Sequence, residues 1–154
     1  VPRALAFEHR FAAAAVDPGV IDAATSWTAP LPRRMQEALV RGEDELFDRD
    51  MHVAHLFAPE TRTLLEARAM PYGGLNGSAY DLFARVATYR LGDEVERIVT
   101  PLLATAVAGE RRWPGQSQAL VQRLAGSSRL VEFTEAEGAC GQGAMKKSSS
   151  AGTP

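Results

Sequence analysis

The feature that most limits how this chain can fold is a strand, a helix and a second strand in succession near its C-terminal end. The apolar run from Leu102 to Val107 predicts a buried strand, Ser117 to Leu124 a helix, and Arg129 to Phe133 another strand. Two strands joined by a helical crossover pair in parallel within one sheet. The sequence therefore predicts an α/β fold built on a parallel sheet.

A third strand is predicted near the start of the chain, far from the other two. The apolar run from Phe11 to Val16 is closed by Asp17, Pro18 and Gly19, which is typical of a buried parallel strand that ends in a turn. Between residues 30 and 87, apolar residues recur at helical spacing and predict three or four amphipathic helices. A helical block therefore interrupts the sheet between its first and second strands.

Composition limits the partners and the setting. The 154 residues are 45% hydrophobic and 23% charged, which is enough for one domain with a core, and the net charge of -2 gives no basic surface for nucleic acid. A membrane helix requires roughly 20 apolar residues, and no run of that length occurs. The single cysteine, Cys140, rules out an intrachain disulfide and favours a cytoplasmic setting. The start at Val1 indicates a chain that begins within a folded structure.

Several short motifs resemble one family. Trp113 to Ser117 (WPGQS) and Phe133 to Ala139 (FTEAEGA) are the most specific, and the other matching segments are 1–11, 16–20, 25–27, 89–93 and 100–103. Together they resemble the C-terminal portion of bacterial serine hydrolases of the α/β-hydrolase family, similar to 2,6-dihydroxypseudooxynicotine hydrolase and the dipeptidyl-peptidase-like hydrolases. The resemblance runs from residue 1 to about residue 140.

The resemblance implies a partial parallel sheet with an inserted helical cap. Residues 1–16 and 91–140 would form the C-terminal part of the hydrolase core, residues 17–90 the cap, and residues 141–154 a disordered tail. The implied parent enzyme attacks an ester, an amide or a carbon–carbon bond next to a carbonyl in a small-molecule substrate. That chemistry needs a catalytic triad and an oxyanion hole, so no metal or organic cofactor is expected.

The catalytic residues that the resemblance implies are incomplete in this chain. The nucleophile belongs to a Gly-x-Ser-x-Gly turn, which would precede Val1; no such motif occurs, and Ser78 fits better as a helix N-cap. Glu110 is the candidate triad acid, with a solvated ion pair to the neighbouring arginines as the alternative. Gln142 occupies the position expected for the triad histidine, and glutamine carries no proton to exchange. As written, the chain should be inactive.

Four aromatic residues of the helical block could line a substrate pocket, with core packing as the alternative use: Trp27, Phe57, Tyr80 and Phe83. Three other interpretations remain open. Cys140 could act as a nucleophile, although no histidine lies near it in the sequence. His52 and His55, one turn after Asp48, could bind a metal on one helix face. The chain could also be a non-catalytic module that binds a small molecule or a partner, and a homodimer would then bury the open strand edge.

Overall fold

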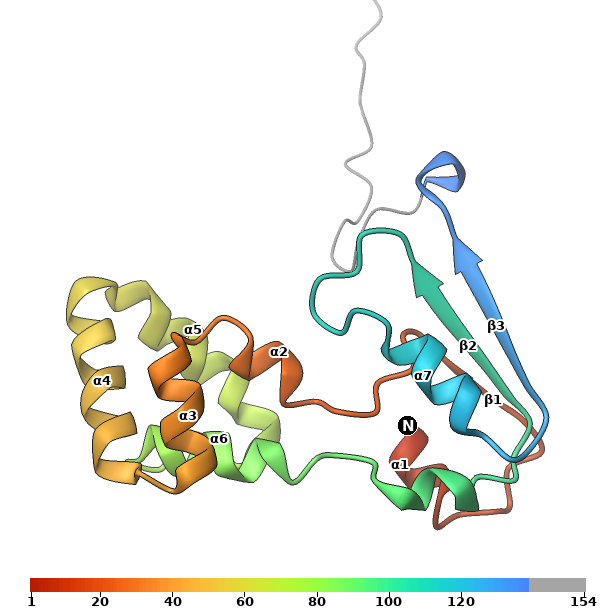
Figure 1. The fold of residues 1–154 in the computed structure, drawn as a ribbon, viewed down its shortest axis with the longest axis horizontal. Helices are drawn as coiled ribbons and strands as arrows, with labels where there is room; N and C mark the ends of the chain where they lie inside the picture. Colours follow the sequence, from red (N-terminus) through yellow and green to blue (C-terminus); the bar gives the residue numbers. More distant parts are fainter. Residues whose placement is uncertain (139–154) are drawn as a thin grey trace, which may run out of the picture. The chain divides into compact units, whose positions relative to one another are not determined.

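A computed structural model of the chain describes residues 1–138, which form a mixed α/β structure of two compact units (Figure 1). Residues 1–21 and 91–138 form one unit, called here the sheet unit; residues 22–90 form the other, the helical unit. No helix among the described residues has both the length and the apolar character needed to cross a membrane.

The sheet unit contains three parallel strands in the order β1-β2-β3, as the sequence predicts. Leu102 of β2 pairs with Ala14 of β1 on one side and with Ser128 of β3 on the other. Its elements are α1 (Pro2–Leu5), β1 (Ala14–Val16), η2 (Asp93–Arg97), β2 (Leu102–Val107), α7 (Gln116–Arg123), β3 (Ser128–Phe133) and η3 (Glu135–Glu137).

The core of the sheet unit lies on one face of the sheet. Leu102 and Ala104 of β2 are buried in a cluster with Leu120 of α7. The alternating residues point to the other face, where Leu103 is 38% exposed and Phe133 of β3 is 42% exposed. Parallel sheets in proteins usually have both faces covered. This sheet, as far as the described residues form it, is covered on one.

The helical unit is built from five helices and one 3-10 turn. Gly42, whose φ of 77° suits glycine, ends one helix, and Ser78 starts another by accepting a hydrogen bond from the N–H of Asp81 at 3.0 Å. The predicted N-cap at Ser78 is therefore confirmed. The elements are α2 (Thr25–Thr28), α3 (Arg33–Arg41), α4 (Asp44–Phe57), α5 (Pro59–Ala69), η1 (Met70–Tyr72) and α6 (Ala79–Ala87).

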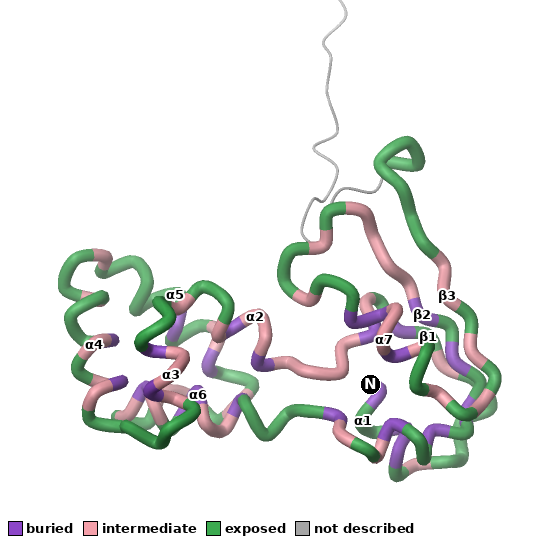
Figure 2. The backbone as a smooth tube through the Cα atoms, in the orientation of Figure 1, coloured by how far each residue is buried: buried purple, intermediate pink, exposed green. Residues whose placement is uncertain are grey.

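Aromatic side chains fill the interior of the helical unit. Phe47 is fully buried, and its ring lies 5.2 Å from that of Phe83, which in turn lies 5.5 Å from Trp27 edge to face. The buried positions of α3, α4 and α6 face one another (Figure 2). Edge-to-face aromatic pairs add to the free energy gained by burial, so these rings hold the helices together.

The two ends of the helical unit lie side by side. The N–H of Ala23 donates to the carbonyl of Tyr89 at 3.1 Å, and Asp22 and Arg90 form an isolated antiparallel bridge. The side chains of Asp22 and Arg90 also form an ion pair of 3.7 Å. The chain therefore leaves the helical unit next to the point at which it came in.

Some predicted elements have different bounds. The strand expected from Phe11 to Val16 is only Ala14–Val16, and Phe11 is 54% exposed. Its alanines have low strand propensity, which explains why so little of the run pairs. At the start of the chain, α1 is a single helical turn.

Candidate functional site

The carboxyl ends of the strands bring polar residues to one edge of the sheet unit. Since the three strands are parallel, Asp17 after β1, the loop 108–115 after β2 and Thr134 after β3 all follow strand ends at the same edge. In open α/β sheets this edge is where ligands bind.

A hydrogen-bond network fixes the turn after β1 against the start of α7. The buried Ser117 donates its hydroxyl hydrogen to the carbonyl of Thr105 at 2.7 Å and accepts from the N–H of Gly19 at 2.9 Å. The hydroxyl of Thr105 in turn donates to the carboxylate of Asp17. A Cβ atom at Gly19 would lie 2.7 Å from Cδ2 of Leu120, so a larger residue there would require the Leu120 side chain to shift. Asp17 is thus held in a fixed position at the sheet edge.

Glu110, the candidate triad acid, lies in the loop directly after β2. Its Oε1 accepts hydrogen bonds from the backbone N–H groups of Arg112, at 2.6 Å, and Trp113, at 3.3 Å. Its Oε2 is buried and has no hydrogen-bond partner among the described residues; the same holds for the indole Nε1 of Trp113. No guanidinium within the described part of the chain forms an ion pair with this carboxylate, so backbone groups, and not the two arginines, hold it.

A second carboxylate at this edge is fixed after β3. The N–H of Thr134 and its hydroxyl group both donate to Oε2 of Glu137 at 2.9 Å, and these hydrogen bonds lower the pKa of Glu137 below its usual value. Two residues of interest in the sequence, Gln142 and Cys140, lie outside the described residues.

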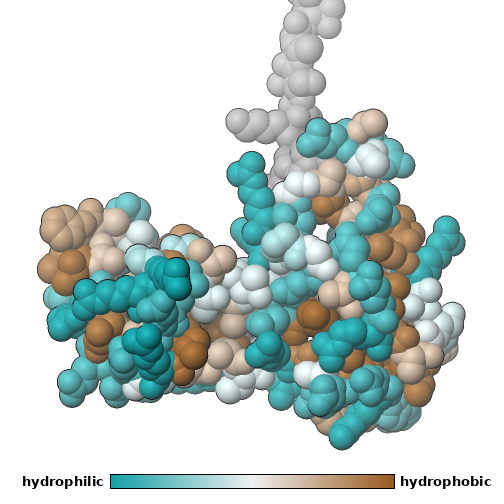
Figure 3. All heavy atoms as spheres, viewed as in Figure 1, coloured by the Kyte–Doolittle hydropathy of each residue, from teal (hydrophilic) through white to brown (hydrophobic). Residues whose placement is uncertain are grey.

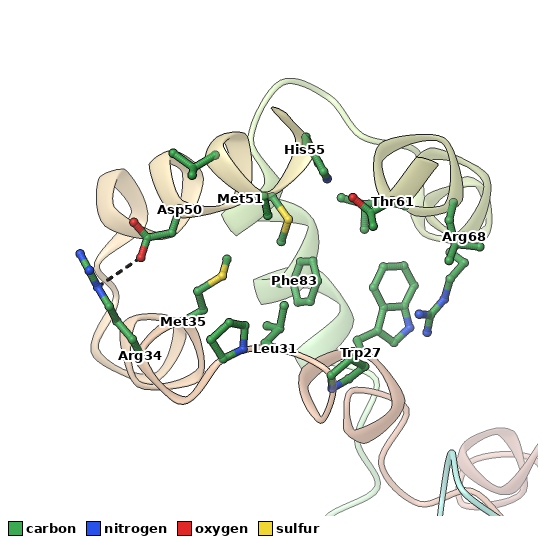
Figure 4. Close-up of a pocket in the computed structure, with 16 residues that line it drawn as sticks. Trp27, Leu31, Arg34, Met35, Asp50, Met51, His55, Thr61, Arg68 and Phe83 are labelled. Carbon is green, nitrogen blue, oxygen red and sulfur yellow. Dashed lines mark ion pairs between the residues drawn. The ribbon is translucent and has the colours of Figure 1, made fainter. Parts of the chain in front are cut away.

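The helical unit contains a pocket of about 440 Å³ between α2, α3, α4 and α5 (Figure 4). Its walls are mostly apolar, and its volume falls within the range of about 300–1,000 Å³ typical of small-molecule sites. Close to it, apolar side chains are exposed where α4 meets α5 (Figure 3). The apolar lining residues are Trp27, Pro30, Leu31, Pro32, Met35, Met51, Val53, Ala54, Leu64, Leu65 and Phe83.

Charged and polar groups occupy distinct parts of the pocket wall. At one end Arg34 and Asp50 form an ion pair of 3.2 Å, and at the other the guanidinium of Arg68 lies 4.3 Å from the centroid of the Trp27 ring (Figure 4). Planar guanidinium groups stack well on indole rings. Arg68 therefore places a positive charge at the aromatic end.

The neutral imidazole of His55 completes the polar part of the wall. Burial lowers the pKa of His55 below its usual value of 6.5. The positive charges of Arg62 and His52 lower it further, against the opposing effect of Glu66. The lowered pKa favours the neutral form of His55 at pH 7, and in that form the imidazole can donate or accept a hydrogen bond without adding charge to the pocket.

The structure separates the four aromatic candidates for substrate binding. Trp27 and Phe83, 5% and 4% exposed, line the pocket. Tyr80 lies outside it, with its ring 6.0 Å from that of Phe47. Phe57, the last residue of α4, is 86% exposed.

The metal site left open as an alternative at His52 and His55 does not assemble from the described residues. Asp48 accepts a hydrogen bond of 2.7 Å from the N–H of Tyr80, and His52 is exposed, while His55 lines the pocket. In residues 1–138 no three histidine, cysteine, aspartate or glutamate side chains form a group that could hold a metal ion. Ser78 is engaged as an N-cap, so the sequence and the structure agree on a structural role for it.

The sequence analysis did not identify the charged groups of the pocket or the hydrogen-bond network of Ser117 at the sheet edge. Arg68 and Trp27 are far apart in the sequence and belong to no shared motif, so no local signal pairs them. For Ser117 a signal existed, because it ends the WPGQS segment that starts α7.

Comparisons of this chain with protein-family models, with curated proteins and with solved structures find no match.

Proposed function

We propose that this chain supplies the acid and a substrate-binding helical unit to a serine hydrolase that cleaves an ester, an amide or a carbon–carbon bond next to a carbonyl. The observation that carries the proposal is the position of Glu110, in the loop directly after β2 at the carboxyl edge of a parallel sheet. One carboxylate oxygen is held by backbone N–H groups, while the other is buried without a partner in the described residues. A triad acid needs such a fixed carboxylate with an acceptor left for histidine.

Two further features support the proposal. A sheet with one exposed face and a strand β1 that pairs on one side only is suited to be extended and covered by more structure. The helical unit is inserted between β1 and β2, where it can carry a pocket without interrupting a strand.

In this mechanism Glu110 would orient a histidine and stabilise its charged form, while the histidine removes the proton of a serine nucleophile. The chain contains no Gly-x-Ser-x-Gly turn, so it would contribute to the reaction without performing it alone.

The test uses the product of the complete open reading frame that contains this chain. We expect a fluorophosphonate probe to label a serine in that protein, and Glu110→Gln to lower its kcat by about 10²- to 10⁴-fold, as loss of a triad acid does. The exposed Glu96→Gln is the matched control and should change kcat little.

The opposite results are informative. Absence of labelling in the folded protein, or an equal effect of the two glutamine variants, would refute the hydrolase proposal.

The alternative function, a non-catalytic module that binds a small molecule, is favoured by one observation, the pocket of the helical unit. That function predicts ligand binding by a protein that no hydrolase probe labels.

A further inference from the structure

We infer that the pocket of the helical unit binds an uncharged small organic molecule that has an aromatic ring and carries at most one hydrogen-bonding group. This inference deepens the proposed function by naming a class of substrate, and it rests on that function only for this role. The pocket is formed entirely by residues of the helical unit, so binding can be tested without any catalytic residue.

The walls of the pocket select the body of the ligand. At the density of liquid water, about 440 Å³ holds about 15 water molecules, or an organic molecule of similar heavy-atom number. Trp27 and Phe83 offer ring surfaces, and Met35 and Met51 offer flexible thioethers that adapt to a ring. Displacing water from such walls favours an apolar ligand with an aromatic ring.

Part of the apolar wall is open to water. Val53 of α4 is 43% exposed and Leu64 of α5 is 59% exposed, and both line the pocket. Exposed apolar side chains at the border of a pocket favour a ligand that covers them, because covering them removes their surface from water. A ligand in this pocket would therefore bury apolar surface of both helices.

The charged side chains of the wall already have partners within the protein. Asp50 and Arg34 form an ion pair of 3.2 Å at one end of the pocket. At the other end the guanidinium of Arg68 lies 4.3 Å from the centroid of the Trp27 ring and donates to the carbonyl of Ser26 at 3.4 Å (Figure 4). An ionised group of a ligand would have to compete with these partners.

An uncharged ligand fits such a wall best. Moving an ionised carboxylate or ammonium group from water to apolar surroundings costs far more free energy than moving a hydroxyl group, unless an opposite charge receives it. Each of the three charged side chains of the wall, Arg34, Asp50 and Arg68, is already engaged by the protein. A charged head group on the ligand should therefore lower its affinity.

The imidazole of His55 can meet one polar atom of the ligand. Burial lowers the pKa of His55, which favours its neutral form at pH 7, and a neutral imidazole both donates and accepts hydrogen bonds. Thr61, by contrast, already uses its hydroxyl hydrogen on the carbonyl of Ala58 at 2.6 Å. The ligand can therefore carry one hydroxyl or carbonyl group that faces His55.

The experiment measures binding of three matched ligands to the full 154-residue chain at pH 7 by titration calorimetry. The probes are 4-phenylbutan-1-ol, 4-phenylbutyrate and 4-phenylbutylamine, which share the ring and the alkyl chain and differ in charge. We expect the alcohol to bind with a Kd below about 1 mM, and the carboxylate and the amine to bind at least about tenfold more weakly.

Two exposed alanines of the helical unit provide the matched variants. Ala54 of α4 lines the pocket, whereas Ala67 of α5 does not. Because both positions are exposed, we expect tryptophan at either one to leave the unit folded, which circular dichroism checks. Ala54→Trp should fill the pocket and weaken binding of the alcohol at least about tenfold, and Ala67→Trp should leave its Kd unchanged.

Each contrary outcome overturns the inference. If the folded chain does not bind the alcohol, the pocket is not a ligand site, and sedimentation of the chain as a dimer would then indicate that a second copy covers these apolar residues. If the carboxylate or the amine binds as tightly as the alcohol, the pocket does not select an uncharged ligand. If the two folded tryptophan variants bind the alcohol equally, the ligand binds elsewhere. None of these results bears on labelling by a fluorophosphonate probe, so the two proposals can fail separately.

Discussion

Replacing Phe83 by alanine is expected to unfold the helical unit, whereas the same replacement at Phe57 should be nearly silent. Phe83 is 4% exposed and lies between the rings of Trp27 and Phe47, while Phe57 is 86% exposed. Removing a buried phenylalanine side chain costs about 3–5 kcal/mol. A unit that spans residues 22–90 has a stability of roughly 3–10 kcal/mol, at about 0.05–0.15 kcal/mol per residue, so Phe83→Ala removes a third or more of it.

The measurement is urea unfolding of the two variants followed by far-ultraviolet circular dichroism. With an m-value of about 1 kcal/mol/M for a small unit, Phe83→Ala should lower the midpoint of the helical transition by about 3–5 M, or abolish the folded state altogether. Phe57→Ala should change the free energy of unfolding by no more than about 0.5 kcal/mol. Equal costs for the two variants, or a cost below about 1 kcal/mol for Phe83→Ala, would refute this account of the core.

Two further predictions concern the sheet edge and the pocket wall. Ser117→Ala leaves the N–H of Gly19 and the carbonyl of Thr105 without their buried partner, and should lower the free energy of unfolding by about 2–4 kcal/mol. Hydrogen exchange at the Gly19 amide should become faster; an unchanged exchange rate would contradict the structural role of the Ser117 hydroxyl. Since the pKa of His55 is lowered in the folded protein, the unfolded state binds more protons near and below pH 6.5, so stability should fall as the pH drops through that range. His55→Gln should reduce this dependence, as measured by urea midpoints from pH 8 to pH 5, and an unchanged dependence would assign it to other groups.

The parallel sheet was predictable because its signals are local. The run that ends at Val107 is apolar and bounded by a proline and a glycine, and its predicted bounds are those of β2. The first strand was predicted too long because four of the six residues in its apolar run are alanines, which are apolar without being strand formers. Where a run of side chains is both apolar and rich in strand formers, the predicted strand bounds are right. Where the run is apolar alone, the predicted strand is too long.

The pocket was only half predictable, because it depends on which helix face points inward. Phe47 and Phe57 are ten residues apart, which at 3.6 residues per turn places them about 80° apart around α4. An apolar series read along the sequence does not show this rotation at the end of a helix, so Phe57 and the buried residues look alike. The pairing of Arg68 with Trp27 arises only when α5 folds back beside α2, and no spacing along the chain encodes it.

The adjacent ends of the helical unit make it separable from the chain that carries it. The N–H of Ala23 donates to the carbonyl of Tyr89, and the N–H of Leu91 donates to the carbonyl of Ile21 at 2.7 Å. These hydrogen bonds hold the two chain segments at the boundary of the helical unit next to each other. Removing the segment between them would leave a gap that a short turn can bridge, and enlarging it would add little loop-closure entropy. A gene encoding such a protein can thus exchange the whole helical unit in a single recombination event without altering the sequence of any strand.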